Sequence, residues 1–212
     1  MVTLYLTDIT PLPDPKEAQW LLPQLTTERR EKTLKYIQAD DRKRCLAAGL
    51  LLREVLPRYG VQPDEIQIGD NDKPEVKGIC FNLSHSGSLV ICAVGTKAVG
   101  CDVEKITKAP KEAAERFFHP NENNCLNNCT QQNYDEVFFR FWTMKESYVK
   151  MTGEGMSLPF DQFEVIPEET GASVRRGDRL LPCRIHEYTI PGYQVAVCTE
   201  EACSPDLIKL SV

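Results

Sequence analysis

The sequence has no apolar run near the roughly 20 residues that a helix needs to cross a bilayer, so we expect no membrane span. Residues Met1 to Leu6 also lack the basic region and longer apolar stretch of a secretory signal, and they predict a short strand instead. Positive charge is scarce, because 25 Lys and Arg stand against 31 Asp and Glu for a net charge of −6. We therefore expect no extended nucleic-acid surface, although a local basic cluster could still bind a small anion.

Two further kinds of site are missing. No Walker-type glycine-rich loop is present, which disfavours a phosphotransferase of that class. Cys125 and Cys129 lie four residues apart in a polar segment near His119, but no second close ligand pair accompanies them, which disfavours zinc. The cysteine count bears on the redox compartment. The nine cysteines are odd in number, and several lie in apolar, strand-like segments. They favour reduced thiols in a cytoplasmic protein over a disulfide framework.

The composition is that of a soluble globular protein, with 42% hydrophobic and 26% charged residues over 212 positions. Helical spacing of apolar residues predicts a helix after Thr26 and Thr27, long helices near 40–56 and 134–151, and a shorter one over 108–118. Residues 79–104 predict a meander of three antiparallel strands, 119–133 a polar loop, and 160–210 further short strands. We therefore predict an α+β fold of two pseudo-symmetric halves, 1–103 and 104–212. Each half would pack an antiparallel sheet with a long helix, with the active site between them.

An acidic pair stands out in the strand-like stretch from Cys101 to Lys105. Side chains alternate along a strand, so Asp102 and Glu104 share one face while Cys101 and Val103 face a core. Two neighbouring carboxylates need a cation or solvent, and Mg²⁺ binds such groups together with phosphate oxygens. The alternative is a solvated polar face of an edge strand.

The helix predicted at 134–151 carries three charged residues of interest. Lys145 falls within its apolar arc, where an unpaired charge is too costly, so we expect a carboxylate or anionic ligand beside it. Glu146 and Lys150 lie at the edge of that arc, four residues apart. They could form an ordinary surface ion pair, but that explanation does not cover Lys145.

Other candidate residues have two interpretations each. His85 follows a buried strand and precedes a glycine turn, so its ring could cap a backbone carbonyl or, with Ser84, contact a phosphate. Arg29, Lys32 and Arg44 could be ordinary surface charges.

These motifs resemble the 4′-phosphopantetheinyl transferases of the Sfp (surfactin) type. The stretch GCDVEK, residues 100–105, is similar to the family's G-[IV]-D-[IV]-E, and FWTMKESYVK, residues 141–150, to its [FW]-[SAT]-x-K-E-[SA]-x-x-K. FNLSHS at 81–86, Lys73-Pro74 and the glycine loop at 153–159 match three further family elements. The matches follow the family's order and cover most of residues 70–165.

The resemblance implies transfer of phosphopantetheine from coenzyme A to a serine of an acyl or peptidyl carrier protein, with Mg²⁺, leaving adenosine 3′,5′-bisphosphate. It implies Asp102, Glu104 and Glu146 as metal ligands, with Glu146 also the base for the serine hydroxyl. Lys150 would hold the pyrophosphate and stabilise the leaving group. The remaining implied coenzyme-binding residues are Ser84 and His85 for phosphates, Lys73 and Pro74 for the adenine pocket, Arg29 and Lys32 for the 3′-phosphate, and Arg44.

The sequence departs from the family pattern at two positions. Cys45 stands where the family often has a small polar residue, and Asp72 where glycine is commoner. A non-catalytic coenzyme- or carrier-binding protein is an alternative, although all three metal carboxylates are present. The carrier is not identified by the sequence: fatty acid, polyketide, nonribosomal peptide and lysine-biosynthesis carriers remain open. We expect a monomer.

Overall fold

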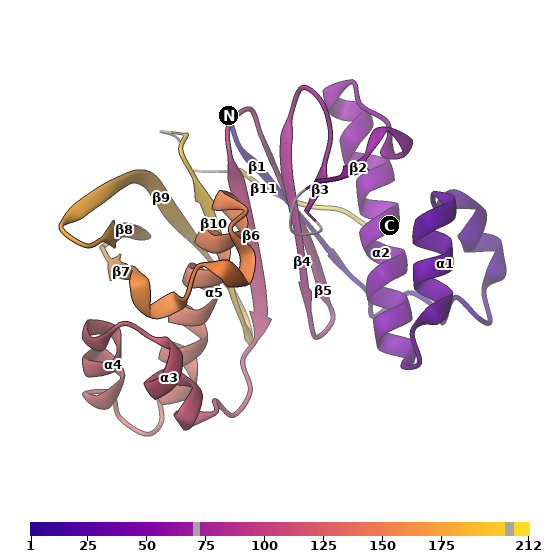
Figure 1. Cartoon of the computed structure of the whole chain (residues 1–212). Helices are drawn as coiled ribbons and strands as arrows, with labels where there is room; N and C mark the ends of the chain where they lie inside the picture. The colour runs from indigo at the N-terminus through magenta and orange to yellow at the C-terminus, as the bar shows by residue number, and fades with distance from the viewer. Residues whose placement is uncertain (70–72, 202–205) are drawn as a thin grey trace.

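The computed structural model describes residues 1–69, 73–201 and 206–212, with the side chain of Met156 left aside. Two sheets lie back to back, with a long helix on the outer face of each (Figure 1). The first sheet has the order β11-β1-β5-β4, and the second β6-β10-β9-β8-β7. The predicted α+β class, with one long helix against each sheet, is confirmed.

The bounds of the elements are as follows. The first sheet comprises β1 (Thr3–Asp8), β4 (Cys80–Ser86), β5 (Leu89–Gly95) and β11 (Asp206–Lys209), and a small hairpin comprises β2 (Gln67–Ile68) and β3 (Pro74–Glu75). The second sheet comprises β6 (Val99–Lys105), β7 (Glu164–Pro167), β8 (Ala172–Arg176), β9 (Arg179–Ile190) and β10 (Tyr193–Thr199). The α-helices are α1 (Thr27–Lys35), α2 (Ala39–Val55), α3 (Lys111–Phe117), α4 (Pro120–Asn127) and α5 (Tyr134–Thr152). Short 3₁₀ segments are η1 (Gln19–Gln24), η2 (Leu56–Tyr59), η3 (Pro63–Glu65), η5 (Gly155–Ser157) and η6 (Phe160–Gln162).

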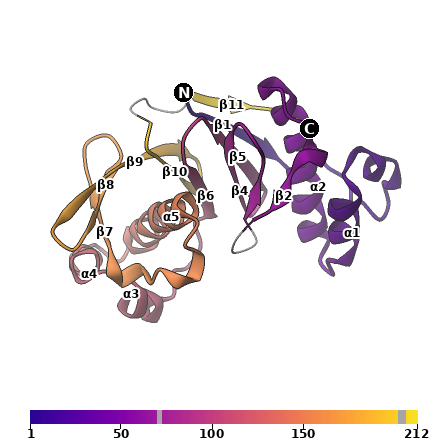
Figure 2. The ribbon, with the colours of Figure 1, turned by 45° about the horizontal axis from the view of Figure 1, so that its top comes forward.

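Three apolar cores separate the four layers. The first lies between α2 and one face of the first sheet, and the third between the second sheet and α5. The middle core joins the facing sides of the two sheets, where Leu4 and Ile91 of the first meet Val103 and Val197 of the second. Strand β5 is buried along its whole length, because both of its faces are covered, as its apolar sequence predicts. Helix α5 lies within the curve of β7 to β10 (Figure 2).

Most of the helices form at the positions that the spacing of apolar residues and the capping residues predict. Thr26 caps α1 by accepting a hydrogen bond from the Arg29 amide, and α2 and α5 differ from the predicted bounds by a residue or two. The loop predicted at 119–133 is wrong, because Pro120–Asn127 forms α4. In its capping box, His119 accepts the Asn121 amide proton while Glu122 accepts that of His119.

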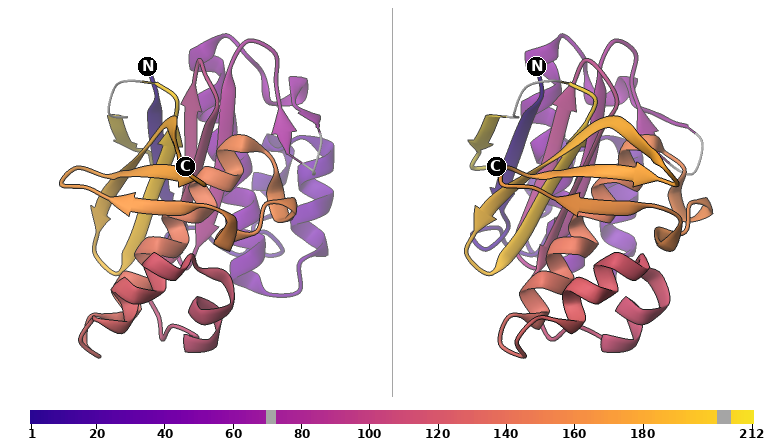
Figure 3. Two further views of the ribbon diagram at one scale, coloured as in Figure 1. Left: turned by 60° about the vertical axis from the view of Figure 1, so that its left-hand side comes forward. Right: turned by 90° about the vertical axis from the view of Figure 1, so that its left-hand side faces the viewer.

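The predicted three-stranded meander is also wrong in its third strand. Strands β4 and β5 pair as expected, but β6 pairs with β10 in the second sheet. The predicted boundary at residues 103 and 104 therefore falls inside β6, and the chain changes sheet between Gly95 and Val99. Strand β11 returns to the first sheet and lies parallel to β1 (Figure 3). No helix of the described residues is long and apolar enough to cross a membrane.

Candidate active site

Helix α5 lies directly on strand β6, and one glycine permits this contact. A Cβ atom placed on Gly100 would lie 2.1 Å from the Ser147 carbonyl oxygen and 2.2 Å from the Met151 amide nitrogen. Both are backbone atoms, so no side chain can move to make room. The even-numbered face of β6 therefore meets α5, and this is the face that carries Asp102 and Glu104.

Asp102 is 2% exposed, and one of its carboxylate oxygens has two partners. Lys150 Nζ of α5 lies 2.6 Å from Asp102 Oδ1, and Ser84 Oγ of β4 donates a hydrogen bond of 2.7 Å to the same oxygen. Burial alone would lower the pKa of Lys150, but the negative charge of Asp102 and the bond to it raise that pKa. Lys150 therefore remains positively charged at neutral pH.

The other two acidic residues of the site interact electrostatically with Asp102. Burial raises the pKa of Glu104, although Ser86 donates a 2.7 Å hydrogen bond to its Oε2, and the charges of Asp102 and Glu146 raise it further. Burial and the charge of Asp102 likewise raise the pKa of Glu146, while Lys150 opposes this effect. Three carboxylates from β6 and α5 thus repel one another around Lys150.

The second oxygen of Asp102 favours a cation at this site. Asp102 Oδ2 is buried and has no hydrogen-bond partner among the described residues. Leaving such an oxygen unsatisfied costs on the order of 1–3 kcal/mol or more, and a hard divalent cation would satisfy it. The described His, Cys, Asp and Glu side chains do not, however, form a closed set of three metal ligands. The donor set accordingly fits an ion that takes one or two carboxylates plus ligand oxygens.

A cavity of about 590 Å³ opens beside these groups. Glu146 and Lys150 contribute its charged wall, together with Lys73 from the first half of the chain. The remaining wall is largely apolar and is formed by Pro74, Phe117, Trp142, Val149, Leu158, Pro159 and Phe160, with Asn82, Gly153 and Gly155. The cavity therefore has walls from both halves of the chain and combines a mostly apolar lining with a few charged groups.

The basic candidates lie in three places. Arg29 and Lys32 of α1 line a smaller cavity of about 140 Å³, which shares Pro74 with the large one. Arg44 donates hydrogen bonds to the Gly87 carbonyl, at 2.8 Å, and to Asp41. Next to that turn, partial burial and the charges of Arg44 and Lys150 lower the pKa of His85.

Lys73 and Cys45 have structural surroundings that the sequence did not indicate. Lys73 Nζ donates to the Lys150 carbonyl at 2.9 Å and to the Met151 carbonyl at 3.4 Å. It therefore caps the C-terminal turn of α5 as well as lining the large cavity. Cys45 is buried in α2. The departure at Asp72 lies outside the described residues.

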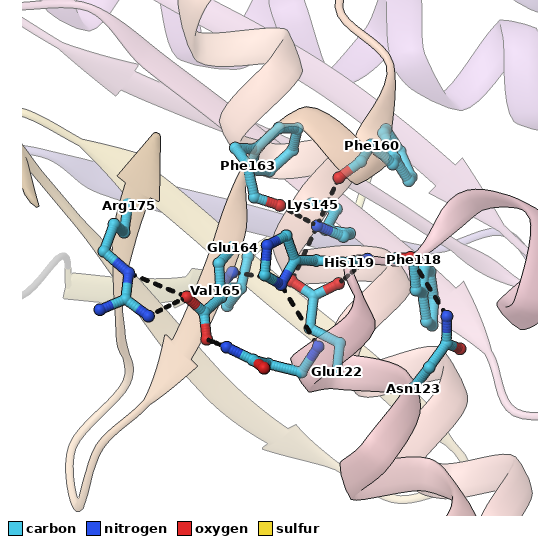
Figure 4. Close-up of polar contacts among 11 residues, drawn as sticks. Phe118, His119, Glu122, Asn123, Lys145, Phe160, Phe163, Glu164, Val165 and Arg175 are labelled. Carbon is cyan, nitrogen blue, oxygen red and sulfur yellow. Dashed lines mark hydrogen bonds and ion pairs between the residues drawn. The ribbon is translucent and has the colours of Figure 1, made fainter. Parts of the chain in front are cut away.

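Lys145 of α5 is not among the residues that line the large cavity. Its ammonium group is fully buried and lies 2.8 Å from Glu122 Oε1, so the predicted carboxylate partner is confirmed (Figure 4). It also donates to the Phe160 and Phe163 carbonyls at 2.8 Å each. Burial lowers the pKa of Lys145 to about 8, while Glu122 opposes this effect. Lys145 therefore links α4 and α5 to residues 160–163, of which Phe160 lines the large cavity.

Comparison with known proteins decides the family. Two family profiles divide the chain between them: "4′-phosphopantetheinyl transferase, N-terminal" matches residues 12–97, and "4′-phosphopantetheinyl transferase superfamily" matches 98–198. The 4′-phosphopantetheinyl transferase Sfp of Bacillus subtilis is 34% identical over 194 residues, which cover 88% of this chain and 87% of the relative. The chain belongs to the Sfp-type 4′-phosphopantetheinyl transferases.

Other relatives of this transferase carry the same family name. The 4′-phosphopantetheinyl transferase psf-1 of Bacillus pumilus is 32% identical over 98% of this chain and 94% of its own length. The 4′-phosphopantetheinyl transferase HetI of a Nostoc strain is 33% identical over 69% of this chain and 68% of its own. The junction of the two profiles at residues 97 and 98 coincides with the change of sheet in the structure.

Sequence reasoning missed several residues of the candidate site. Asn82 and Ser86 belong to a matched motif, but neither was singled out as a partner of β6. Their alternation with Ser84 along one strand could have indicated that they share its face. The aromatic cavity wall of Phe117 and Phe160 was also missed, because these residues come from segments that meet only in the folded chain.

Proposed function

We propose that this transferase moves 4′-phosphopantetheine from coenzyme A to a serine hydroxyl of an acyl or peptidyl carrier protein, with Mg²⁺. One observation carries the proposal: Lys150 and Glu146 of α5, which line a large and mostly apolar cavity, interact with Asp102 and Glu104 of β6. Phosphoryl transfer requires mainly positioning and neutralisation of charge. These residues provide both at one place.

Asp102, Glu104 and Glu146 are the carboxylates proposed for the metal: one or two of them would bind it directly, with oxygens of the bound substrate as further ligands. The unpartnered Oδ2 of Asp102 is the oxygen best suited to it. A divalent ion there would neutralise the carboxylates and polarise a bound diphosphate. Lys150 keeps its charge and would stabilise the departing adenosine 3′,5′-bisphosphate. Glu146 would accept the proton of the carrier serine as the serine oxygen bonds to phosphorus and the diphosphate bridge breaks.

The rest of the coenzyme would occupy the surrounding surfaces. Arg29 and Lys32 line a small cavity next to Pro74, which suits a phosphate near an adenine ring. Arg44, His85 and the turn at Gly87 form a basic end to β4 that suits further phosphate oxygens. Lys73 would contribute to the adenine pocket while capping α5. The apolar cavity wall is compatible with the uncharged arm of the coenzyme.

We also propose that the enzyme acts as a monomer in the cytoplasm. The described cysteines are all free thiols, most of them buried, which suits a reducing compartment. The candidate site draws its residues from both halves of a single chain and requires no second copy.

The test is incubation of the protein with coenzyme A, Mg²⁺ and a panel of apo carrier proteins, followed by mass spectrometry of each carrier. We expect at least one carrier to gain the mass of one phosphopantetheinyl group. Glu146→Gln should abolish the gain, whereas Glu136→Gln, an exposed position on the same helix, should leave it unchanged. A folded protein that binds coenzyme A but modifies no carrier would instead support a non-catalytic binding role.

A further inference from the structure

Side chains of β4, rather than its backbone, bind the free edge of β6. The Cys101 amide donates to Asn82 Oδ1 at 2.9 Å, and the Val103 amide donates to Ser84 Oγ at 3.4 Å. The Lys105 amide donates to Ser86 Oγ at 3.1 Å. Three alternate residues of one strand thus satisfy three alternate amides of the other, and we call Asn82, Ser84 and Ser86 the β4 ladder.

The ladder follows from the geometry of the two strands. Alternate amides of a strand point to opposite edges, and the other edge of β6 is already paired with β10. The odd-numbered residues Phe81 and Leu83 of β4 pack toward α2, so its even-numbered residues point toward β6. The three amides on that edge of β6 would otherwise remain unpaired, which is costly where they are buried.

The two serines have a second contact that Asn82 lacks. Each hydroxyl has one proton to donate, and Ser84 gives it to Asp102 Oδ1 while Ser86 gives it to Glu104 Oε2. The hydrogen bond that each hydroxyl accepts from a β6 amide sets the orientation of that hydroxyl. Each hydroxyl then holds one oxygen of the carboxylate to which it donates. The other oxygen of Asp102, Oδ2, is the buried atom without a partner among the described residues.

We propose that Ser84 and Ser86 are positioning residues that aim Asp102 and Glu104 at a divalent cation. The inference rests on the proposed function, because that function places the cation between these carboxylates. Hydroxyls on the first sheet thereby set the direction of ligands on the second sheet. Partners of this kind that hold a metal ligand typically contribute about 10–100-fold to metal affinity.

Ser86 provides the cleaner test, because Ser84 also contacts Lys150, at 3.1 Å. We would measure Mn²⁺ binding by electron paramagnetic resonance, with Mn²⁺ alone and with Mn²⁺ plus coenzyme A, and record thermal unfolding of the metal-free protein. Ser86→Ala should weaken Mn²⁺ binding about 10-fold or more. Ser86→Thr, which keeps the hydroxyl, should restore most of it.

The matched control is Ser173→Ala. Ser173 Oγ also donates to a carboxylate, that of Glu168, but on β8 in the outer part of the second sheet. It should leave Mn²⁺ affinity unchanged whatever it does to thermal stability. Comparison of Ser86→Ala with Ser173→Ala distinguishes the loss of an oriented metal ligand from a general loss of protein stability.

Equal Mn²⁺ affinity for wild type and Ser86→Ala would overturn the positioning role, even if the wild type modifies carriers. Absence of Mn²⁺ binding by the wild type, with and without coenzyme A, would overturn it as well. Weakened Mn²⁺ binding in Ser86→Ala would support it even if no carrier were modified, and in that case only the proposed transfer would be rejected.

Discussion

Substitution of Gly100 by alanine tests whether the contact between α5 and β6 builds the site. The new Cβ would lie 2.1 Å from the Ser147 carbonyl oxygen, whereas real Cβ contacts essentially never fall below 3.0 Å. Helix α5 would therefore have to retreat by about 0.9 Å at this point. The same shift applied to Lys150 would lengthen its 2.6 Å contact with Asp102 beyond a normal hydrogen bond.

Two measurable effects follow. Overpacking of this kind costs about 1–3 kcal/mol, and at about 2–4 °C per kcal/mol for a chain of this size the melting temperature should fall by roughly 2–12 °C. Displacement of catalytic groups by about 1 Å can cost on the order of 100-fold in rate. Differential scanning calorimetry and the rate of carrier modification at saturating coenzyme A would measure the two effects.

Gly177→Ala is the control for Gly100→Ala. Gly177 has φ +58° and no atom within 4 Å of the position that a Cβ would take, so the change introduces backbone strain of about 1–2 kcal/mol without a clash. It should lower the melting temperature but leave transfer intact. A Gly100→Ala protein with normal melting temperature and normal transfer would refute the claim that this close approach positions Lys150.

Three further outcomes are expected. Lys145→Met should lower the free energy of unfolding in urea by about 3–5 kcal/mol, because it leaves Glu122 buried without its cation, and Lys145→Met/Glu122→Gln should recover part of the loss. Burial alone would raise the pKa of Glu201, but the amino group of Met1 and hydrogen bonds from Thr96 lower it to about 2. The ionised Glu201 therefore stabilises the folded state above its ordinary pKa near 4.5, and this stabilisation is lost as the pH falls toward 2. Glu201→Gln should therefore reduce the fall in melting temperature between pH 4.5 and pH 2. Removal of divalent ions with EDTA should abolish carrier modification and added Mg²⁺ should restore it; persistent transfer in EDTA would contradict a metal role.

Features set by local sequence were predictable. The shared face of Asp102 and Glu104 follows from strand alternation, and the need of Lys145 for an acidic partner follows from its place in an apolar arc. The sequence did not identify Glu122 as that partner, because Glu122 lies in a polar segment that was predicted as a loop. The helix in this segment begins at His119, whereas Ser, Thr, Asp and Asn are the usual N-cap residues.

Features set by distant segments were not predictable. Strand β6 follows β5 closely and was therefore assigned to the same meander, but its partner β10 is about 90 residues further along the chain. The local sequence pattern of β6 is compatible with pairing to β5 or to β10. The pairing with β10 depends on how the two sheets pack against each other through the middle core. The cavity wall has the same origin, since Phe117 and Phe160 approach each other only around α5.

Strand β11 has a consequence for shortened forms of the chain. It covers the outer edge of β1, yet its residues, 206–209, come after every candidate site residue in the sequence. A nascent or truncated chain that ends at Thr199 would contain every candidate site residue and still present the bare edge of β1. Such edges readily recruit strands from other molecules, so loss of this short strand, far from the site, should make the transferase prone to aggregate.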